Sequence, residues 1–214
     1  MTVKNDFTII PEPSLRRLPL YYDFLKRLET SDIKFISCTE IAQNLGFNPI
    51  QVRKDIEYTE IIGRPKVGYN IKELKLSIKD FLGWNNSKDA FLIGAGHLGI
   101  ALLGYRGFMN SGINIISAFD NDPKKIDSIF FGKKIFNVSI LGQLINRMNI
   151  KLCIITVPAP SAQSIVDIAI KSGVKVIWNF APCILNVPDT IFIKNENLTS
   201  SLAILTRKLK DDFK

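Results

Sequence analysis

The hydrophobic pattern of the chain changes near residue 84. Before that point apolar residues recur at helical spacing, as in Leu18–Leu28, where Pro19 is expected in the first turn of a helix. Beyond it, short apolar runs typical of buried strands alternate with stretches at helical spacing, and this alternation predicts an α/β domain with a doubly wound parallel sheet. The expected strands are Ala90–Ile93, Ile113–Phe119, Lys134–Val138 at the sheet edge, Leu152–Val157 and Val174–Phe180.

Two helix start signals stand close together in the N-terminal part. Ser37 and Glu40 have the spacing of a capping box, and the helix that follows is expected to stop at Gly46. Asn48 then offers a second N-cap, with a proline at the first helical position and a helix running to about Tyr58. Two capped helices joined around a glycine predict a helix-turn-helix.

The second of these helices carries side chains that suit nucleic acid. Together with a β-hairpin expected over Ile61–Ile71, whose tip would lie along the phosphate backbone as a wing, it predicts a winged helix that binds DNA. The candidate DNA-contacting residues are Ser37, Gln51, Arg53, Lys54, Tyr58, Arg64 and Lys66. A dimerisation or partner-docking module is the alternative, because Asp55, Glu57 and Glu60 stand among the basic residues.

A glycine-rich loop follows the first expected strand of the C-terminal part. Gly94, Gly96 and Gly99 have the G-x-G-x-x-G spacing, and a helical run begins directly after them. The first glycine of this motif makes the turn, the second admits a pyrophosphate to the backbone, and the third lets helix and strand pack closely. The motif in this context predicts a Rossmann-like dinucleotide-binding domain.

A carboxylate at the end of the next strand points to the kind of dinucleotide. Asp120 stands 21 residues beyond Gly99, where it would bond ribose hydroxyls and repel a 2′-phosphate, so NAD(H) is favoured over NADP(H). Lys124 and Lys125 could pair with a 2′-phosphate, which is the alternative, but they are interpreted as solvated loop charges. Two further strand ends are expected around the nicotinamide, with core packing as the alternative for Phe180. The candidate cofactor-binding residues are Gly94, Ala95, Gly96, His97, Leu98, Gly99, Asp120, Val157, Pro158, Asn179 and Phe180.

Composition limits the remaining possibilities. The chain has 214 residues and a net charge of +8, but residues 1–85 hold 13 Lys and Arg against 11 Asp and Glu, so charge alone favours DNA only weakly. Its three cysteines are too few and too scattered for a zinc site, and no metal is expected. The N-terminus lacks a signal sequence and no apolar run could span a bilayer, so the expected location is the cytoplasm.

No catalytic arrangement is visible in the sequence. His97 is the only histidine and lies in the phosphate loop, so neither a Ser-His-Asp nor a Cys-His site can form. Tyr22 and Lys26 have the spacing of a short-chain dehydrogenase pair, but they precede the glycine loop instead of following it. A ligand sensor is therefore favoured over an enzyme. A small NAD(H)-dependent oxidoreductase and a CoA- or nucleotide-binding regulator remain as alternatives.

Taken together, both halves resemble the Rex family of redox-sensing transcriptional repressors, from about Leu15 to Lys210. The stretches that carry the resemblance are Arg17–Tyr22, Val52–Asp55, Val67–Asn70, Gly94–Gly99, Tyr105–Phe108, Ala118–Asp120, Thr156–Pro158 and Asn179–Pro182. The resemblance implies a homodimer that represses genes by binding operator DNA while NAD⁺ prevails and is released by NADH. It implies domains at 1–83 (winged helix) and 84–196 (dinucleotide binding), and a dimerisation helix at 197–214 that crosses into the partner.

The resemblance also assigns roles and shows departures. It implies DNA contacts for Arg53 and Lys54, and places Arg17 and Tyr105 in a network that links the nucleotide to subunit closure. Tyr58–Gly63 departs from the usual Tyr-Phe-Gly-x-Phe-Gly, which affects the operator sequence. Asn197 stands where an aspartate is usual, and this switch residue is unable to pair with Arg17 as a carboxylate would.

Overall fold

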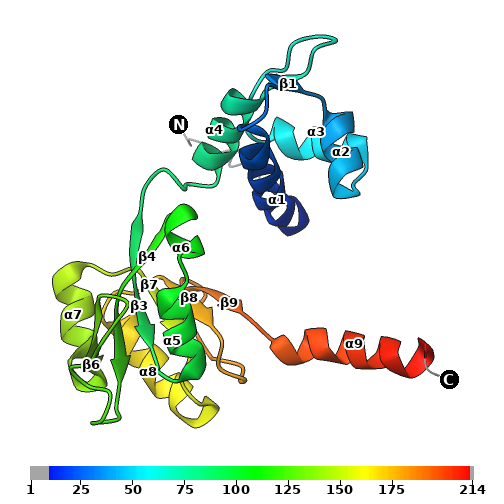
Figure 1. Ribbon diagram of the computed structural model, residues 1–214. Helices are drawn as coiled ribbons and strands as arrows, with labels where there is room; N and C mark the ends of the chain where they lie inside the picture. Colours follow the sequence, from blue (N-terminus) through cyan, green and yellow to red (C-terminus); the bar gives the residue numbers. More distant parts are fainter. Residues whose placement is uncertain (1–9, 213–214) are drawn as a thin grey trace, which may run out of the picture. The chain divides into compact units, whose positions relative to one another are not determined.

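The chain folds into two units, Met1–Asn86 and Ser87–Lys214. The structure is a computed structural model that describes residues 10–212, apart from the side chains of residues 198, 200, 201 and 212. Residues 1–9 and 213–214, and with them the outer ends of the first and last expected domains, lie outside the described residues. The first unit is coloured blue to cyan-green in Figure 1 and the second green to red.

The first unit is helical with a two-stranded antiparallel sheet. A single apolar core, which includes the fully buried Tyr21, Ile41, Val52 and Leu74, holds the helices together. Its elements are α1 (Glu12–Leu28), β1 (Phe35–Ile36), α2 (Cys38–Leu45), α3 (Pro49–Glu57), β2 (Tyr69–Asn70) and α4 (Ile71–Phe81).

The capping signals place α2 and α3 as the sequence predicts. The Ser37 hydroxyl accepts a hydrogen bond from the Glu40 amide, and the Glu40 carboxylate accepts one from the Ser37 amide, which confirms the capping box. Gly46 ends α2 in the left-handed conformation at φ 70°. Asn48 caps α3 by accepting from the Ile50 amide at 2.8 Å. The helix-turn-helix is therefore confirmed.

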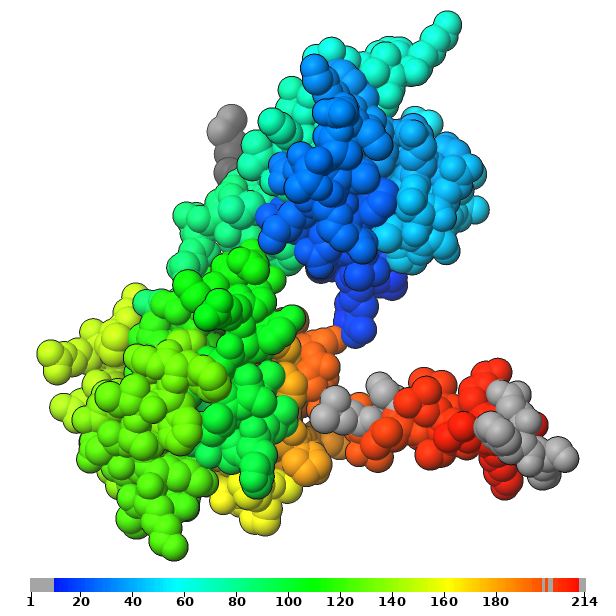
Figure 2. All heavy atoms as spheres, in the orientation of Figure 1, coloured from blue at the N-terminus to red at the C-terminus, as the bar shows by residue number. Residues whose placement is uncertain are grey.

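Two details of this unit differ from the sequence expectation. Pro19 lies in the interior of α1, because the helix begins at Glu12 with a different proline, Pro13, in its first turn. The expected 61–71 hairpin is reduced to one bridge between Arg64 and Gly68, since β2 pairs with β1 and leaves no partner for a longer ladder. The wing is therefore a short tip, which projects from its unit as a narrow ridge in Figure 2.

The second unit is built on a seven-stranded sheet. The sheet order is β5-β6-β4-β3-β7-β8-β9, and all neighbours are parallel except β5 and β6. Leaving β5 aside, this is the 3-2-1-4-5-6 order of a Rossmann fold, with its switch point between β3 and β7. The strands are β3 (Lys88–Ile93), β4 (Ile113–Asp120), β5 (Ile129–Phe130), β6 (Lys133–Asn137), β7 (Leu152–Ile155), β8 (Val176–Asn179) and β9 (Phe192–Asn195).

Helices cover both faces of this sheet. Apolar residues of α5, such as Leu103, pack with Leu92 and Ile115 on one face. Residues of α7 and α8, such as Ile145 and Val166, form the larger core on the other. The helical elements are α5 (His97–Gly104), α6 (Gly107–Asn110), the 3-10 turn η1 (Val138–Ile140), α7 (Leu141–Met148), α8 (Ala159–Lys171) and α9 (Leu198–Asp212).

The sheet edges are where the sequence expectation is wrong. The strand expected at the edge, β6, is covered by the two-residue strand β5. A tight turn at Phe131 and Gly132 joins β5 to β6, and the two strands pair antiparallel. The opposite edge is β9, which follows a stretch without regular structure and had no visible alternation. Within residues 10–212, no helix combines the length and apolar content needed to cross a bilayer.

Candidate functional site

The glycine loop lies at the switch point of the sheet, between β3 and α5. Gly94 has φ 104°, and a Cβ there would lie 2.7 Å from the carbonyl carbon of Thr156. A Cβ on Gly99 would lie 1.9 Å from the carbonyl oxygen of Gly94. Among the described residues, by contrast, no heavy atom lies within 4 Å of the Cβ position of Gly96. The first and third glycines are thus required by packing, while the second leaves open space for a ligand.

Thr156 ties the loop to the neighbouring strand. Its hydroxyl lies 2.7 Å from the Gly94 carbonyl oxygen and 3.0 Å from that of Ile93, so it donates to this pair of acceptors. Its amide also donates to the Ile93 carbonyl at 2.8 Å. Thr156 belongs to a stretch that carries the family resemblance but was given no site role from the sequence, although a hydroxyl at the carboxyl end of the strand next to the loop is a usable signal.

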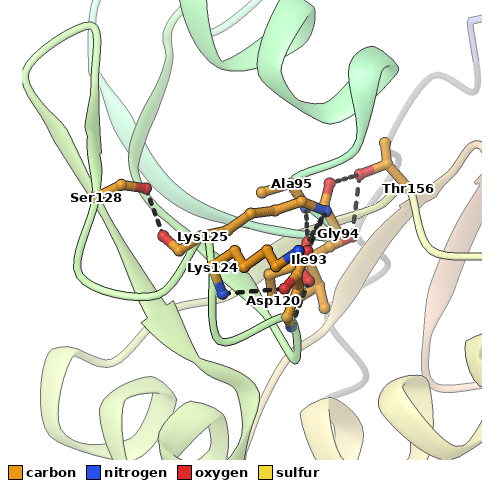
Figure 3. A network of polar contacts seen from close by, with 9 residues as sticks. Ile93, Gly94, Ala95, Asp120, Lys124, Lys125, Ser128 and Thr156 are labelled. Atoms are coloured by element: carbon orange, nitrogen blue, oxygen red, sulfur yellow. Dashed lines mark hydrogen bonds and ion pairs between the residues drawn. The ribbon is translucent and has the colours of Figure 1, made fainter.

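Asp120 holds the loop from the side of β4, as Figure 3 shows. One carboxylate oxygen accepts from the Ala95 amide at 2.7 Å and the other from the Asp122 amide at 2.9 Å. The Lys125 ammonium is 3.3 Å from the first oxygen. Burial raises the pKa of Asp120, but the two amides and then the Lys125 charge outweigh it, and the net pKa is lowered. Asp120 is therefore ionised at neutral pH.

Lys125 corrects one interpretation from the sequence. It is half-buried and reaches back to Asp120, so it is not a solvated loop charge, whereas Lys124 is exposed as expected. Because it lines the same cavity as Asp120, it places one positive charge beside that carboxylate at the cavity wall.

A cavity of about 680 Å³ opens at this edge of the sheet. Of the eleven candidate cofactor-binding residues, the cavity is lined by Gly94, Gly96, Leu98, Asp120, Val157, Pro158 and Phe180. Lining residues that the sequence analysis missed are Ile93, Phe119, Asn121, Asp122, Lys125, Val138, Thr156, Ser161, Ile165 and Pro182. The first turn of α5 faces this region with N–H groups that have no intrahelical acceptor and with the positive end of the helix dipole. The geometry suits an anionic diphosphate.

Four candidate residues do not line this cavity. Ala95 is buried, His97 is exposed, and Gly99 packs inside α5. Asn179 is 1% exposed, and its amide group donates to the carbonyls of Ala181 and Cys183 and to the side chain of Asn195. Asn179 therefore shapes the segment after β8, and its side chain is committed to the protein.

A chain of four aromatic rings leads away from the cavity. Phe180 contacts Trp178 with ring centroids 4.9 Å apart, Trp178 contacts Phe108 at 5.3 Å, and Phe108 contacts Tyr105 at 4.9 Å. The Trp178 indole donates to Glu196 at 3.0 Å, directly before the start of α9. Tyr105 and the residues that precede α9 are thus connected to the cavity wall by direct contacts.

The candidate DNA-contacting residues all lie in the first unit. Gln51, Lys54 and Tyr58 line one shallow hollow beside α3. Arg53 is exposed on the outer face of α3, and its guanidinium pairs with Glu57 at 3.1 Å. The hydroxyl of Ser37 is engaged in the capping box.

The wing and α3 present separate positive charges. At the wing, the Arg64 guanidinium lies 4.9 Å over the Phe35 ring, and Lys66 is exposed with φ 64°. Among the described residues, neither Arg64 nor Lys66 takes part in an ion pair, whereas the exposed Arg53 of α3 is paired with Glu57 of the same helix.

Arg17 is committed to a buried ion pair within the first unit. Its guanidinium donates two hydrogen bonds to Asp55 of α3, at 2.6 and 2.8 Å, and the Tyr21 hydroxyl donates to the same carboxylate at 2.7 Å. Burial raises the pKa of Asp55, but these donors outweigh it and the net pKa is lowered. Of the three switch residues, Arg17 thus lies in one unit, and Tyr105 and Asn197 lie in the other.

Replacing Asp120 by alanine is expected to weaken NADH binding at least about tenfold. The change removes the carboxylate that the sequence predicts as the ribose acceptor and leaves the Ala95 amide without its acceptor, and a hydrogen bond to a charged group contributes about 1.5–3 kcal/mol. The preference for NADH over NADPH should narrow as well. Titration calorimetry with both nucleotides measures this, and Asp127→Asn, an equal change of charge on the exposed side of the loop, is the control. Unchanged discrimination would refute the placement of the ribose.

Comparison with known proteins gives consistent matches to both units. A family model described as "CoA binding domain" matches residues 85–183, and one described as "Putative DNA-binding protein N-terminus" matches residues 9–56. The redox-sensing transcriptional repressor Rex of Treponema denticola is 43% identical over 193 residues, which cover 90% of this chain and 92% of that protein. The protein of the same name from Desulforamulus reducens is 39% identical, covering 94% of this chain and 95% of that protein.

Solved structures match over the same range. A crystal structure of RSP in complex with β-NAD⁺ and operator DNA has a TM-score of 0.90 at 32% identity, covering 95% of this chain and 94% of that one. A structure of RSP, described as a Rex-family repressor, has a TM-score of 0.84 at 31% identity and covers 95% of each chain. RSP in complex with β-NADH has a TM-score of 0.84 at 32% identity, covering 95% of this chain and 96% of that one.

Proposed function

Because this chain belongs to the Rex family of redox-sensing transcriptional repressors, we propose that it represses transcription by binding operator DNA and leaves the operator when NADH occupies its cavity. The observation that carries the proposal is the presence, in one chain, of a capped helix-turn-helix and a dinucleotide cavity at a Rossmann switch point. The alternative of a small NAD(H)-dependent oxidoreductase is rejected, because the relatives are transcriptional repressors.

The cavity supplies the groups that NAD(H) requires. The open position at Gly96 and the first turn of α5 take the pyrophosphate, and Asp120 takes the adenine ribose. Pro158 and Phe180, at the ends of two further strands, lie around the nicotinamide. The protein's part is to bind and orient the nucleotide, since a sensor needs only a difference in affinity between two states.

The DNA interface is formed by α3 and the wing. The basic side chains on α3 approach the major groove, and those of the wing approach the backbone. When DNA binds, the Arg53 guanidinium leaves Glu57 and contacts the DNA instead. Breaking this exposed ion pair costs little free energy, because surface ion pairs contribute at most about 1 kcal/mol. The interface residues are Ser37, Gln51, Arg53, Lys54, Tyr58, Arg64 and Lys66.

Replacing Arg53 by alanine is expected to weaken operator binding by about 1–3 kcal/mol if the side chain contacts a base. NADH affinity should remain the same, because the two functions lie in different units. Gel-shift titration with calorimetry of the nucleotide checks both statements. Arg16→Ala, which removes an equally exposed arginine paired on α1, is the matched control. A variant with full operator affinity would remove Arg53 from the interface.

The C-terminal helix α9 forms the dimer contact. Leu202, Ile204, Leu205 and Leu209 of α9 are each more than half exposed, which a soluble chain avoids unless a partner covers them. We assign residues 1–83 to DNA binding, 84–196 to the dinucleotide and 197–214 to the dimer contact, which crosses into the partner. Arg17 pairs with Asp55 of its own unit, and the uncharged Asn197 is unable to offer it a second anionic partner.

The switch is a two-state equilibrium of the dimer. In one state the two α3 helices have the spacing of successive major grooves, about 34 Å for half-sites one turn apart. NADH favours a second state in which that spacing is lost. A loss of DNA affinity of about 30-fold requires only about 2 kcal/mol of differential binding.

Selection of genomic DNA fragments by the purified protein tests this function. We expect enrichment of a palindromic operator with NAD⁺ and its loss with NADH. A thermal-shift series with NAD⁺, NADH, NADPH and CoA separates the sensor from the remaining alternative, a regulator that binds CoA. Enrichment that is independent of NADH, or stabilisation by CoA alone, would overturn the proposal.

A further inference from the structure

Ile50 is an apolar side chain on the charged outer face of α3. Its relative exposure is 67%, and it lies outside the apolar core that buries Val52 and Ile56 of the same helix. Residues three and four positions apart share a helix face, so Ile50 lies on the face that carries Arg53 and Lys54. It also lines the hollow formed by Gln51, Lys54 and Tyr58.

Local folding does not explain an isoleucine at this position. A β-branched side chain is a weaker helix former than alanine, and its exposed methyl groups gain nothing from burial. Its backbone is nevertheless held firmly, because Pro49 begins the helix and Asn48 accepts a hydrogen bond from the Ile50 amide at 2.8 Å. A residue that is unfavourable both for the helix and for a solvent-exposed position, and that has no compensating contact in the fold, is expected at a functional position.

The neighbours of Ile50 indicate what covers it. Two flanking cations, Arg53 and Lys54, favour a polyanion over an apolar protein surface, and the first turn of a recognition helix meets base edges. The major groove offers one apolar group among its edges, the 5-methyl group of thymine. We propose that Ile50 reads a thymine in each operator half-site by packing against that methyl group. This inference rests on the proposed DNA-binding function.

The test removes single methyl groups from the DNA. The operator that the full-length protein selects is synthesised with each thymine replaced in turn by deoxyuridine, which keeps every hydrogen-bonding group. We expect one position per half-site at which the replacement weakens binding about fourfold, the effect of about 0.8 kcal/mol for one methyl-sized group. Replacing both symmetric positions should weaken binding roughly fifteenfold.

The Ile50→Ala variant, combined with the deoxyuridine operators, completes a double-mutant cycle between the protein and the DNA. Ile50→Ala should lose affinity for the thymine operator to a similar extent, and should bind the thymine and deoxyuridine operators equally. Leu76→Ala, a truncation on α4 of a side chain that is also more than half exposed, should retain the full methyl dependence. An unchanged circular dichroism spectrum and unchanged NADH affinity show that each variant is folded.

The two proposals fail in different ways. If the wild-type protein selects no duplex at all, the proposed function fails. If it selects an operator but no single deoxyuridine weakens binding, or if Ile50→Ala keeps the same methyl dependence as the wild type, the assignment of Ile50 alone is overturned.

Discussion

Replacing Gly99 by alanine is expected to destabilise the second unit by at least about 3 kcal/mol, the upper range for overpacking. The new Cβ would lie 1.9 Å from the Gly94 carbonyl oxygen, which is backbone. That backbone has little freedom to move, because the Gly94 amide donates to Phe119 and its carbonyl accepts from Thr156. Urea unfolding followed by circular dichroism measures the loss.

Gly96→Ala is the matched control for this prediction. Gly96 has φ −74°, which any residue adopts, and among the described residues no atom approaches its Cβ position within 4 Å. We expect unchanged or slightly higher stability, by up to about 1 kcal/mol. NADH affinity should nevertheless fall, because the methyl group would occupy the space that we assign to the pyrophosphate. If both variants lose stability equally, or if Gly96→Ala binds NADH normally, the roles given to the two glycines are wrong.

Replacing Asp55 by alanine is expected to destabilise the first unit by about 3–5 kcal/mol. The change leaves the half-buried guanidinium of Arg17 and the buried hydroxyl of Tyr21 without their acceptor, and breaking one side of a buried ion pair has a cost of this size. Because Asp55 belongs to α3, operator binding should be lost together with stability. Denaturation curves of the variant and the wild type give the difference.

The exposed neighbour on the same helix provides the comparison. Glu57→Ala removes an ion pair that is open to solvent and should change stability by no more than about 1 kcal/mol. The pH dependence has a definite sign. Since folding lowers the pKa of Asp55, its stabilisation is complete above the unfolded pKa of about 3.9 and is lost as the pH falls through the folded value. Equal losses in the Asp55 and Glu57 variants would contradict the importance of the buried pair.

The elements that the sequence predicts well are those with local signals. The capping box at Ser37, the N-cap at Asn48 and the glycine at 46 act within four residues, so they define α2 and α3 directly. The glycine fingerprint is similarly local and defines the loop, whereas Asp120 contacts Ala95 from 25 residues away and was found through its spacing from the glycines. Edge strands lack such signals, which explains why β5 and β9 were missed and β6 was placed at the edge.

Side-chain partners were harder to predict, because they depend on residues far away in the chain. Asn179 follows a strand that ends at the cavity, but the segment behind it saturates its amide. Lys125 is adjacent to an exposed lysine, yet the turn after β4 returns it to Asp120. Asp55 weakened the case for a DNA-binding helix in the sequence, whereas in the structure it is buried with Arg17 and leaves the basic outer face of α3 intact.

Calorimetric titration of NADH into the full-length dimer, alone and saturated with its operator, measures the coupling between the nucleotide site and the DNA-binding site. Coupling between two sites is reciprocal, so a nucleotide that lowers operator affinity about 30-fold must itself bind about 30-fold more weakly when the operator is present. We expect that loss of NADH affinity, and we expect it to disappear when the operator is replaced by a duplex that the protein does not bind. Equal NADH affinity with and without the operator would contradict the coupling.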